Sequence, residues 1–339
     1  MDSAPAFPDP ALTANIYCSG RLDAVIFGAV APFWRELRPH DPGRLGHLWL
    51  MRYGKGGEHL KIRFHGPESC RPLIRGRLEE RVTAFLGSLE PPAEPAPQVR
   101  EKAPPIDAED AVAENHPDLT FLWTTYRRSP VSLGGKPFLD DDRYADLLTR
   151  CLAHGCERVL ALQPGADGLL SHQARQATLC GALLAGLGAL GFAAPARADY
   201  LAYHRDWLVR ATLPSDQRSE RAPVEEINRR FDVQIARMGG PPVPLRRAAE
   251  SEWDGAGEPA SGTDPYAGWR RSLADLLAYV APLCRDPGYH LEPFATDPVF
   301  APVFKVFHGF ANQLGLKRID EAFAHHLLFR IATEPGAPA

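Results

Sequence analysis

Alternating apolar and polar residues near the start of the chain predict a small sheet. Residues 48–52 and 59–65 are typical of two strands, and the glycines of "GKGG" between them favour a turn. A repeat near 3.6 residues predicts helices in segments such as 22–37 and 70–89. The first ninety residues therefore predict a compact α+β unit.

Helical periodicity dominates the remainder of the chain. A strand-like segment, "FLWTTYRR", begins at Phe121, and the segments predicted as helices after it include 143–162, 171–190, 200–212 and 266–284. The predicted fold class is α+β, with an N-terminal antiparallel or mixed sheet and flanking helices, followed by a largely helical second half.

Composition divides the chain further, because proline-rich and polar stretches separate the periodic ones. We expect one intimately packed catalytic fold, in which the segments around Pro91–Pro105 and Gly239–Pro265 are exposed. The predicted segments are an α+β unit with a cationic strand (14–89), a Pro-rich linker (90–118), a strand plus helices (119–213), a partly mobile loop (214–265) and C-terminal helices (266–333).

Charge and composition exclude several classes of protein. The formal net charge of −4 over 339 residues is unlike that of a nucleic-acid-binding surface. The most apolar run, 179–194, is too short and glycine-rich to span a bilayer, and the N-terminal residues lack the pattern of a signal peptide, so we expect a cytoplasmic protein. The six cysteines form no C-x-x-C pair, and we expect neither a metal nor a cofactor.

The second strand carries a row of basic residues. Successive side chains point to opposite faces, so Leu60, Ile62 and Phe64 share one face. The other face receives His59, Lys61, Arg63 and His65. We expect Arg52 near this row once the turn brings the first strand back. The row is either a solvated face, which is common in antiparallel sheets, or an anion site, since arginine binds carboxylates through two hydrogen bonds.

Three motifs, which occur along the chain in the same order as in a known family, resemble the motifs of that family. The stretch "RYGKGGEHLKIRF" resembles the "RY…PHLRLR" signature of the C-terminal elimination domain of class I lantibiotic dehydratases and of stand-alone thiopeptide-type bacteriocin biosynthesis proteins. "TTYRRSPVSLGG" occupies the place of the family's "TYEPEIERYGG", and "VFHGFANQLGL" resembles its "H-M-x-x-N-R-L-G". The resemblance covers nearly the whole chain.

The resemblance implies site residues where the motifs match. Arg52, Arg63 and His308 coincide with the arginines of the first motif and the histidine of the last, which implies catalytic roles. The residues expected to bind substrate are His59, Lys61, Tyr126, Arg127 and Arg128. The chain departs from the family at Gln313, which replaces an arginine, and in the middle motif, where Arg128, Ser129 and Ser132 stand among positions that the family gives to two glutamates and an arginine.

The chemistry of the resembled family explains these residue types. There a Ser or Thr of a precursor peptide is glutamylated by a separate domain that uses glutamyl-tRNA, and the elimination domain then removes glutamate. The step needs a base for the Cα proton and donors for the developing oxyanion and the carboxylate. Arg52 and Arg63 suit the donors, and His308 suits the acid or base, although a histidine on a Phe-rich helix is also typical of a hydrogen-bonded core residue.

Three functions are compatible with the sequence. The first is a lyase-type enzyme that eliminates glutamate to give dehydroamino acids. The second is a [4+2] cycloaddition between two dehydroalanines that forms a pyridine, which the departures in the middle motif favour. The third is a non-catalytic protein that binds the precursor peptide.

The partners that the resemblance implies are a precursor peptide and a separate glutamylation-domain protein, and a homodimer is compatible with it. We expect no direct contact with nucleic acid or membrane. If the basic row forms an active-site wall, His308 should lie within roughly 10–12 Å of Arg52 and Arg63, because all three would act on one substrate.

Overall fold

The computed structural model describes seven stretches of the chain, and the protein divides into two compact units. The first unit is Met1–Ser171 with Pro282–Pro298, and the second is His172–Ala281 with Val299–Ala339. The described residues are 12–38, 45–54, 57–90, 116–125, 141–253, 264–283 and 300–334.

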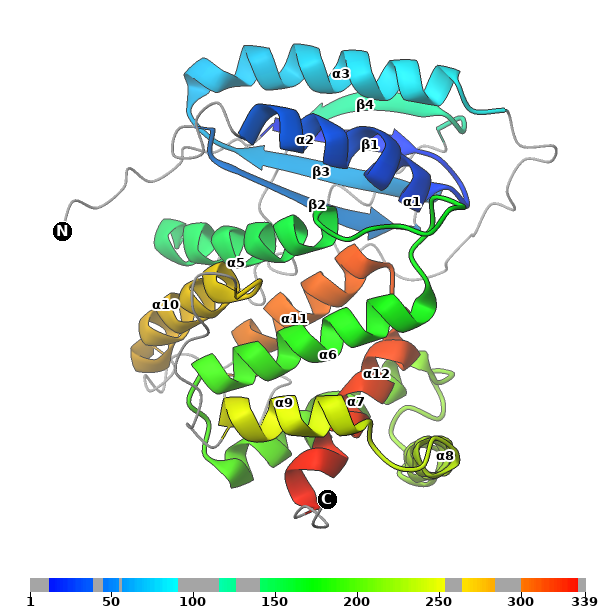
Figure 1. Cartoon of the computed structure of the whole chain (residues 1–339), viewed down its shortest axis with the longest axis vertical. Helices are drawn as coiled ribbons and strands as arrows, with labels where there is room; N and C mark the ends of the chain where they lie inside the picture. The colour runs from blue at the N-terminus through cyan, green and yellow to red at the C-terminus, as the bar shows by residue number, and fades with distance from the viewer. Residues whose placement is uncertain are drawn as a thin grey trace. The chain divides into compact units, whose positions relative to one another are not determined.

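The first unit contains a four-stranded antiparallel sheet (Figure 1). Its strands are β1 (Leu12–Tyr17), β2 (His47–Tyr53), β3 (His59–His65) and β4 (Thr120–Thr125). The order across the sheet is β2-β3-β1-β4, so the predicted hairpin of β2 and β3 forms one side of the sheet. Together with the helices of the second unit, this sheet confirms the predicted α+β class.

Helices cover the apolar face of the sheet. A continuous helical segment comprises α1 (Leu22–Val25), a π-helical turn (Ile26–Val30) and α2 (Ala31–Leu37), and α3 (Arg71–Gly87) packs against it. Gly28 marks the point of closest approach, because a Cβ atom built there would lie 2.3 Å from the ring of Phe85. The side chains of Leu48, Leu50, Ile62 and Phe64 are buried on this face.

Helix α5 (Asp142–Leu160) packs along the edge strand β2 (Figure 1). Its first turn is capped by Asp141, whose carboxylate accepts a hydrogen bond from the backbone N–H of Tyr144 at 2.9 Å. An acidic side chain in this position satisfies one of the N–H groups that the first turn of a helix leaves without a backbone partner. A helix that packs along an edge strand also protects the sheet from pairing with other chains.

The described residues of the second unit form helices joined by turns and short connections. Its elements are α6 (His172–Ala189), α7 (Ala194–Thr212), α8 (Ala222–Arg237), α9 (Val243–Trp253), α10 (Ala267–Leu283, whose last two residues belong to the first unit), α11 (Phe300–Leu314) and α12 (Arg318–Thr333). Helix α12 packs along α7, and α6 packs against α9, α11 and α12. Burial on several sides explains the apolar composition of α6.

One segment differs from its prediction. Residues 214–265 were predicted as a partly mobile loop, but α8 and α9 lie within it. Helix α8 buries Val224, Phe231 and Ile235, which recur at a helical spacing that the polar composition of the segment conceals. In the described part of the chain, no helix is long and apolar enough to cross a lipid bilayer.

Candidate functional site

The basic row lies on the face of the sheet opposite α1, α2 and α3. In the register of β2 and β3, Trp49 faces Arg63, Met51 faces Lys61 and Tyr53 faces His59. Strand β1 continues the same face, where Thr13 lies opposite Arg63. The relative exposures of His59, Lys61 and Arg63 are only 6%, 8% and 4%. The interpretation of the row as a solvated face is therefore wrong.

Aromatic rings separate the basic groups of this face. The Lys61 ammonium lies 4.7 Å from the centre of the Tyr53 ring, and the Arg63 guanidinium lies 4.8 Å from that of Trp49. The ring of His59 stacks on Tyr53. Cation–π contacts hold a cation in place without adding a negative charge beside it. We call Trp49, Tyr53, His59, Lys61 and Arg63 the basic aromatic face.

Arg52 does not belong to this face. It lies opposite Leu60, on the helix-covered side of the sheet, where its guanidinium donates to the Asp23 carboxylate at 2.6 Å. Asp23 is 5% exposed, and its second oxygen accepts a hydrogen bond from the backbone N–H of Leu170 at 3.2 Å. The expectation that Arg52 lies near the basic row is wrong, because Arg52 comes three positions after Trp49 along β2 and an odd spacing puts two side chains on opposite faces.

The middle motif lies outside the described residues. Tyr126, Arg127 and Arg128 follow β4 directly, but the structure does not describe them, so their roles in substrate binding stay predictions. Gln313, the other departure from the family, is completely buried on α11.

His308 on α11 differs from an enclosed core histidine. Its side chain is 27% exposed, and its Nδ1 donates to the Glu321 carboxylate of α12 at 2.7 Å. One side of the ring stacks on Phe304, with ring centres 5.4 Å apart, whereas Phe307 and Phe310 point into the core. In a neutral imidazole, a proton on Nδ1 leaves the lone pair on Nε2, which is the arrangement that a general base needs.

Neutral polar groups surround the Glu321 carboxylate in the core of the second unit. Burial lowers the pKa of His204 well below its usual value and also lowers that of His325. Burial and the nearby Glu321 charge raise the pKa of Tyr200 well above its usual range. These three groups are uncharged at neutral pH. The polar cluster therefore comprises His308 and Glu321, with Tyr200, His204 and His325 behind them.

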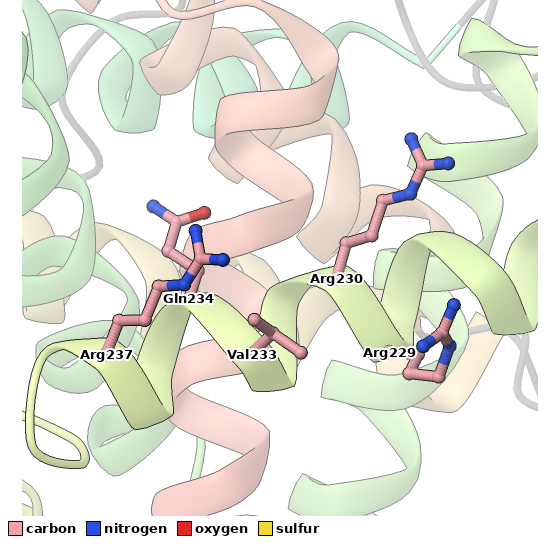
Figure 2. A pocket seen from close by; sticks show the side chains of 5 residues that line it. All are labelled: Arg229, Arg230, Val233, Gln234 and Arg237. Atoms are coloured by element: carbon pink, nitrogen blue, oxygen red, sulfur yellow. The ribbon is translucent and has the colours of Figure 1, made fainter.

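A surface hollow on α8 has a different character. It has a volume of about 340 Å³ and is lined by Arg229, Arg230, Val233, Gln234 and Arg237, all from one helix (Figure 2). Arg229 and Arg230 pair with the same carboxylate, that of Glu226. The hollow offers positive charge but has no acid or base among its lining residues, so we place no chemistry there.

Of two features of the site that were not predicted, one could have been found from the sequence and the other could not. The aromatic residues Trp49 and Tyr53 could have been identified from the sequence, because the alternation in "HLWLMRY" puts them on the same face. Glu321 had no local signal beyond being an acid in an apolar helix, since its partner His308 lies on another helix. The predicted distance of His308 from the arginines involves two separate units and stays a prediction.

The sequence matches the family model described as "Lantibiotic biosynthesis dehydratase C-term" over residues 12–332. The chain therefore belongs to that family, a class of proteins that modify peptides in antibiotic biosynthesis. None of the curated proteins searched is similar enough to this chain to match it.

Solved structures with TM-scores above 0.5 share the fold. The chain is similar to the pyridine synthase TbtD from thiomuracin biosynthesis, with 16% identity, a TM-score of 0.59 and coverage of 96% of this chain and 98% of TbtD. It is also similar to TsrL, with 13% identity, a TM-score of 0.53 and coverage of 97% and 99%. The tRNA-dependent lantibiotic dehydratase MibB from Microbispora sp. 107891 shows 16% identity and a TM-score of 0.48, with coverage of 98% of this chain and 28% of MibB.

Proposed function

We propose that this chain eliminates glutamate from glutamylated Ser or Thr residues of a precursor peptide and so forms dehydroamino acids. The observation that carries the proposal is the basic aromatic face, where Lys61 and Arg63 are buried beside aromatic rings. A cation that has already lost its water and is held in position binds a carboxylate more strongly than a solvated one. The glutamyl leaving group carries carboxylates that such cations can bind.

The reaction balances without any added reactant. A base removes the Cα proton of the glutamylated residue, the electron pair forms the Cα–Cβ double bond, and the Cβ–O bond breaks as glutamate leaves. His308 is our candidate for the base, because its Nε2 carries a lone pair and its ring is partly exposed. Lys61 and Arg63 are our candidates for binding the leaving carboxylate.

The proposal also implies partners. A glutamyl-transfer reaction must supply the ester, for which a separate glutamylation protein is the candidate partner, and the substrate is a precursor peptide. Tyr126, Arg127 and Arg128 remain candidates for substrate binding on the resemblance alone. No cofactor enters the proposed step, since neither electrons nor groups other than glutamate are transferred.

Pyridine formation by [4+2] cycloaddition is a second candidate. It is favoured by the likeness to TbtD, which extends over 98% of that chain, and by the departures from the family pattern in the middle motif. This reaction joins two dehydroalanines and expels water and the leader peptide, so it needs no glutamyl group.

Substrate preference separates these functions. The protein should be incubated with a glutamylated precursor peptide and, separately, with the same peptide already carrying dehydroalanines. Elimination predicts release of free glutamate from the first peptide, measured by mass spectrometry. Loss of a leader fragment from the second peptide alone would contradict elimination and support cycloaddition. Binding of either peptide without turnover would contradict both and support a non-catalytic role.

A further inference from the structure

The contact between His308 and Glu321 has features that a purely structural contact does not need. Glu321 is 1% exposed, yet in the described part of the chain its carboxylate hydrogen-bonds only to His308, and Oε1 has no hydrogen-bond partner there. A buried carboxylate with one hydrogen bond is costly, and stable structures normally satisfy such a group more fully. Proteins tend to keep such locally unfavourable groups where they serve a function.

The position of Glu321 partly offsets this cost. It lies in the first turn of α12, where its backbone N–H donates to the carbonyl of Lys317. The unpaired N–H groups at the beginning of a helix favour a negative charge nearby. The charge is thus held at a fixed point beside α11, while Tyr200, His204 and His325 add only neutral groups around it.

The orientation of the His308 ring is fixed from two directions. Phe304 stacks on the ring at an interplanar angle of 11°, and His204 stacks on Phe304 at 6°, with ring centres 4.4 Å apart. This stack sets the plane of the imidazole, and the hydrogen bond to Glu321 sets its rotation within that plane. Together they fix the direction of the Nε2 lone pair.

A second histidine on α12 shows what a structural pair looks like. His326 is 2% exposed, its Nε2 donates to the Asp232 carboxylate at 2.8 Å, and its Nδ1 accepts from Arg205 at 3.2 Å. Both ring nitrogens are occupied by protein groups, so His326 has none left for a substrate. In the described part of the chain, His308 has a partner at Nδ1 only.

We propose that Glu321 is a positioning residue for His308. By accepting the Nδ1 proton it holds the neutral imidazole in the tautomer whose lone pair is on Nε2, and it stabilises the imidazolium that forms when Nε2 takes a proton. This inference rests on the proposed function, in which His308 is the base. Its structural part, the tautomer, does not depend on any reaction.

The tautomer is measured first, on the whole chain labelled with ¹⁵N-histidine. Two-bond ¹H–¹⁵N NMR spectra distinguish the two neutral tautomers, and the variant His308→Asn identifies the His308 signals by their loss. We expect the Nδ1–H form to predominate in the natural chain at a pH where His308 is neutral. Predominance of the Nε2–H form would overturn the proposal without any variant.

The kinetic test uses Glu321→Gln with Asp232→Asn as its matched control. Loss of a residue that orients a reactive histidine typically costs about 10–100-fold, so we expect kcat for glutamate release to fall by that factor in Glu321→Gln, with KM little changed. The His308 spectrum should shift toward the Nε2–H form. Asp232→Asn should leave kcat and the His308 tautomer unchanged, since Asp232 contacts His326.

The outcomes separate the two proposals. Unchanged kcat and an unchanged tautomer in Glu321→Gln would overturn the role of Glu321. If the natural chain releases no glutamate, the proposed function fails, while the NMR spectrum still decides whether Glu321 fixes the tautomer. If Glu321→Gln does not fold, the tautomer seen in the NMR spectrum of the natural chain still decides whether the proposal holds.

Discussion

Arg52 and Arg63 lie on neighbouring strands of one sheet, but they point to opposite sides of it. Arg52 lies under the helices and donates to Asp23, which is 5% exposed, so its charge is neutralised inside the protein. Arg63 lies on the basic aromatic face, where its guanidinium lies over the ring of Trp49, a group that carries no opposite charge. The same type of side chain therefore lies against a carboxylate on one face and over an aromatic ring on the other.

The difference shows why a motif does not define a site by itself. Both arginines belong to the stretch that resembles the family signature, and both suit a carboxylate-binding role on residue type. The register of β2 against β3 decides between them, because Arg52 pairs with Leu60 whereas Arg63 pairs with Trp49. We therefore expect that substitutions at Arg52 mainly change stability, and that substitutions at Arg63 mainly change activity.

The largest expected effect is on stability at Arg52. Arg52→Ala leaves the buried Asp23 carboxylate without its counter-charge, which typically costs about 3–5 kcal/mol of the free energy of unfolding. Urea unfolding of the natural chain and the variant measures the difference. Arg77→Ala, an exposed arginine on α3, is the control and should change the free energy by less than about 0.5 kcal/mol. A similar small change in Arg52→Ala would contradict the structural role.

The second effect is on activity at Arg63. Loss of one charge-assisted donor from a desolvated site costs about 10²-fold or more, so Arg63→Ala should lower kcat/KM for glutamate release by that factor. The circular dichroism spectrum should stay unchanged. Arg237→Ala in the surface hollow of α8 removes the same side chain and should leave kcat/KM within about twofold. Equal activities of the two variants would remove Arg63 from the site.

The comparison also shows what the sequence could predict. Period-2 and period-3.6 patterns predict the hairpin of β2 and β3 and most helices, because these elements are local, but the same patterns missed α8 and α9. Alternation alone puts Lys61 and Arg63 on one face. The side of the sheet on which Arg52 lies could be known only from the register of β2 against β3. The contact of Glu321 with His308 could be known only once the fold brings α12 beside α11. Both are tertiary features, which no short stretch of residues encodes. The burial of Lys61 and Arg63 is also a tertiary feature, which is why the sequence allowed the interpretation as a solvated face that the structure contradicts.

A smaller effect concerns the aromatic rings. Cation–π contacts are worth roughly 0.5–2 kcal/mol, so Trp49→Leu should raise KM for the glutamylated peptide by roughly 2–30-fold, since Arg63 loses the ring that holds it. Trp123→Leu is a matched control: Arg75 lies 5.4 Å from the centre of that ring, on the helix-covered side of the sheet. If both variants raise KM equally, the two faces do not differ in function.

The smallest effect is on the pH dependence of stability, and it arises at one end of the face that carries Arg63. His47 pairs with His65 there, and burial, reinforced by nearby His154 and Arg150, lowers the pKa of His47 to about 4. The unfolded chain therefore binds this proton more readily than the folded one does. The stability that neutral His47 contributes is complete above its unfolded pKa of about 6.5 and is lost as the pH falls from there toward 4.

For a fall from pH 6.5 to 5.5 this loss amounts to about 1 kcal/mol for His47. Urea unfolding at the two pH values should show it as a difference between the natural chain and His47→Asn, whose side chain does not titrate. Burial lowers the pKa of His204 and His325 in the same direction, but they remain in both proteins, so the difference isolates His47. Identical pH dependence of the two proteins would mean that His47 takes up a proton as easily in the folded chain as in the unfolded one, and that this end of the face is open to water.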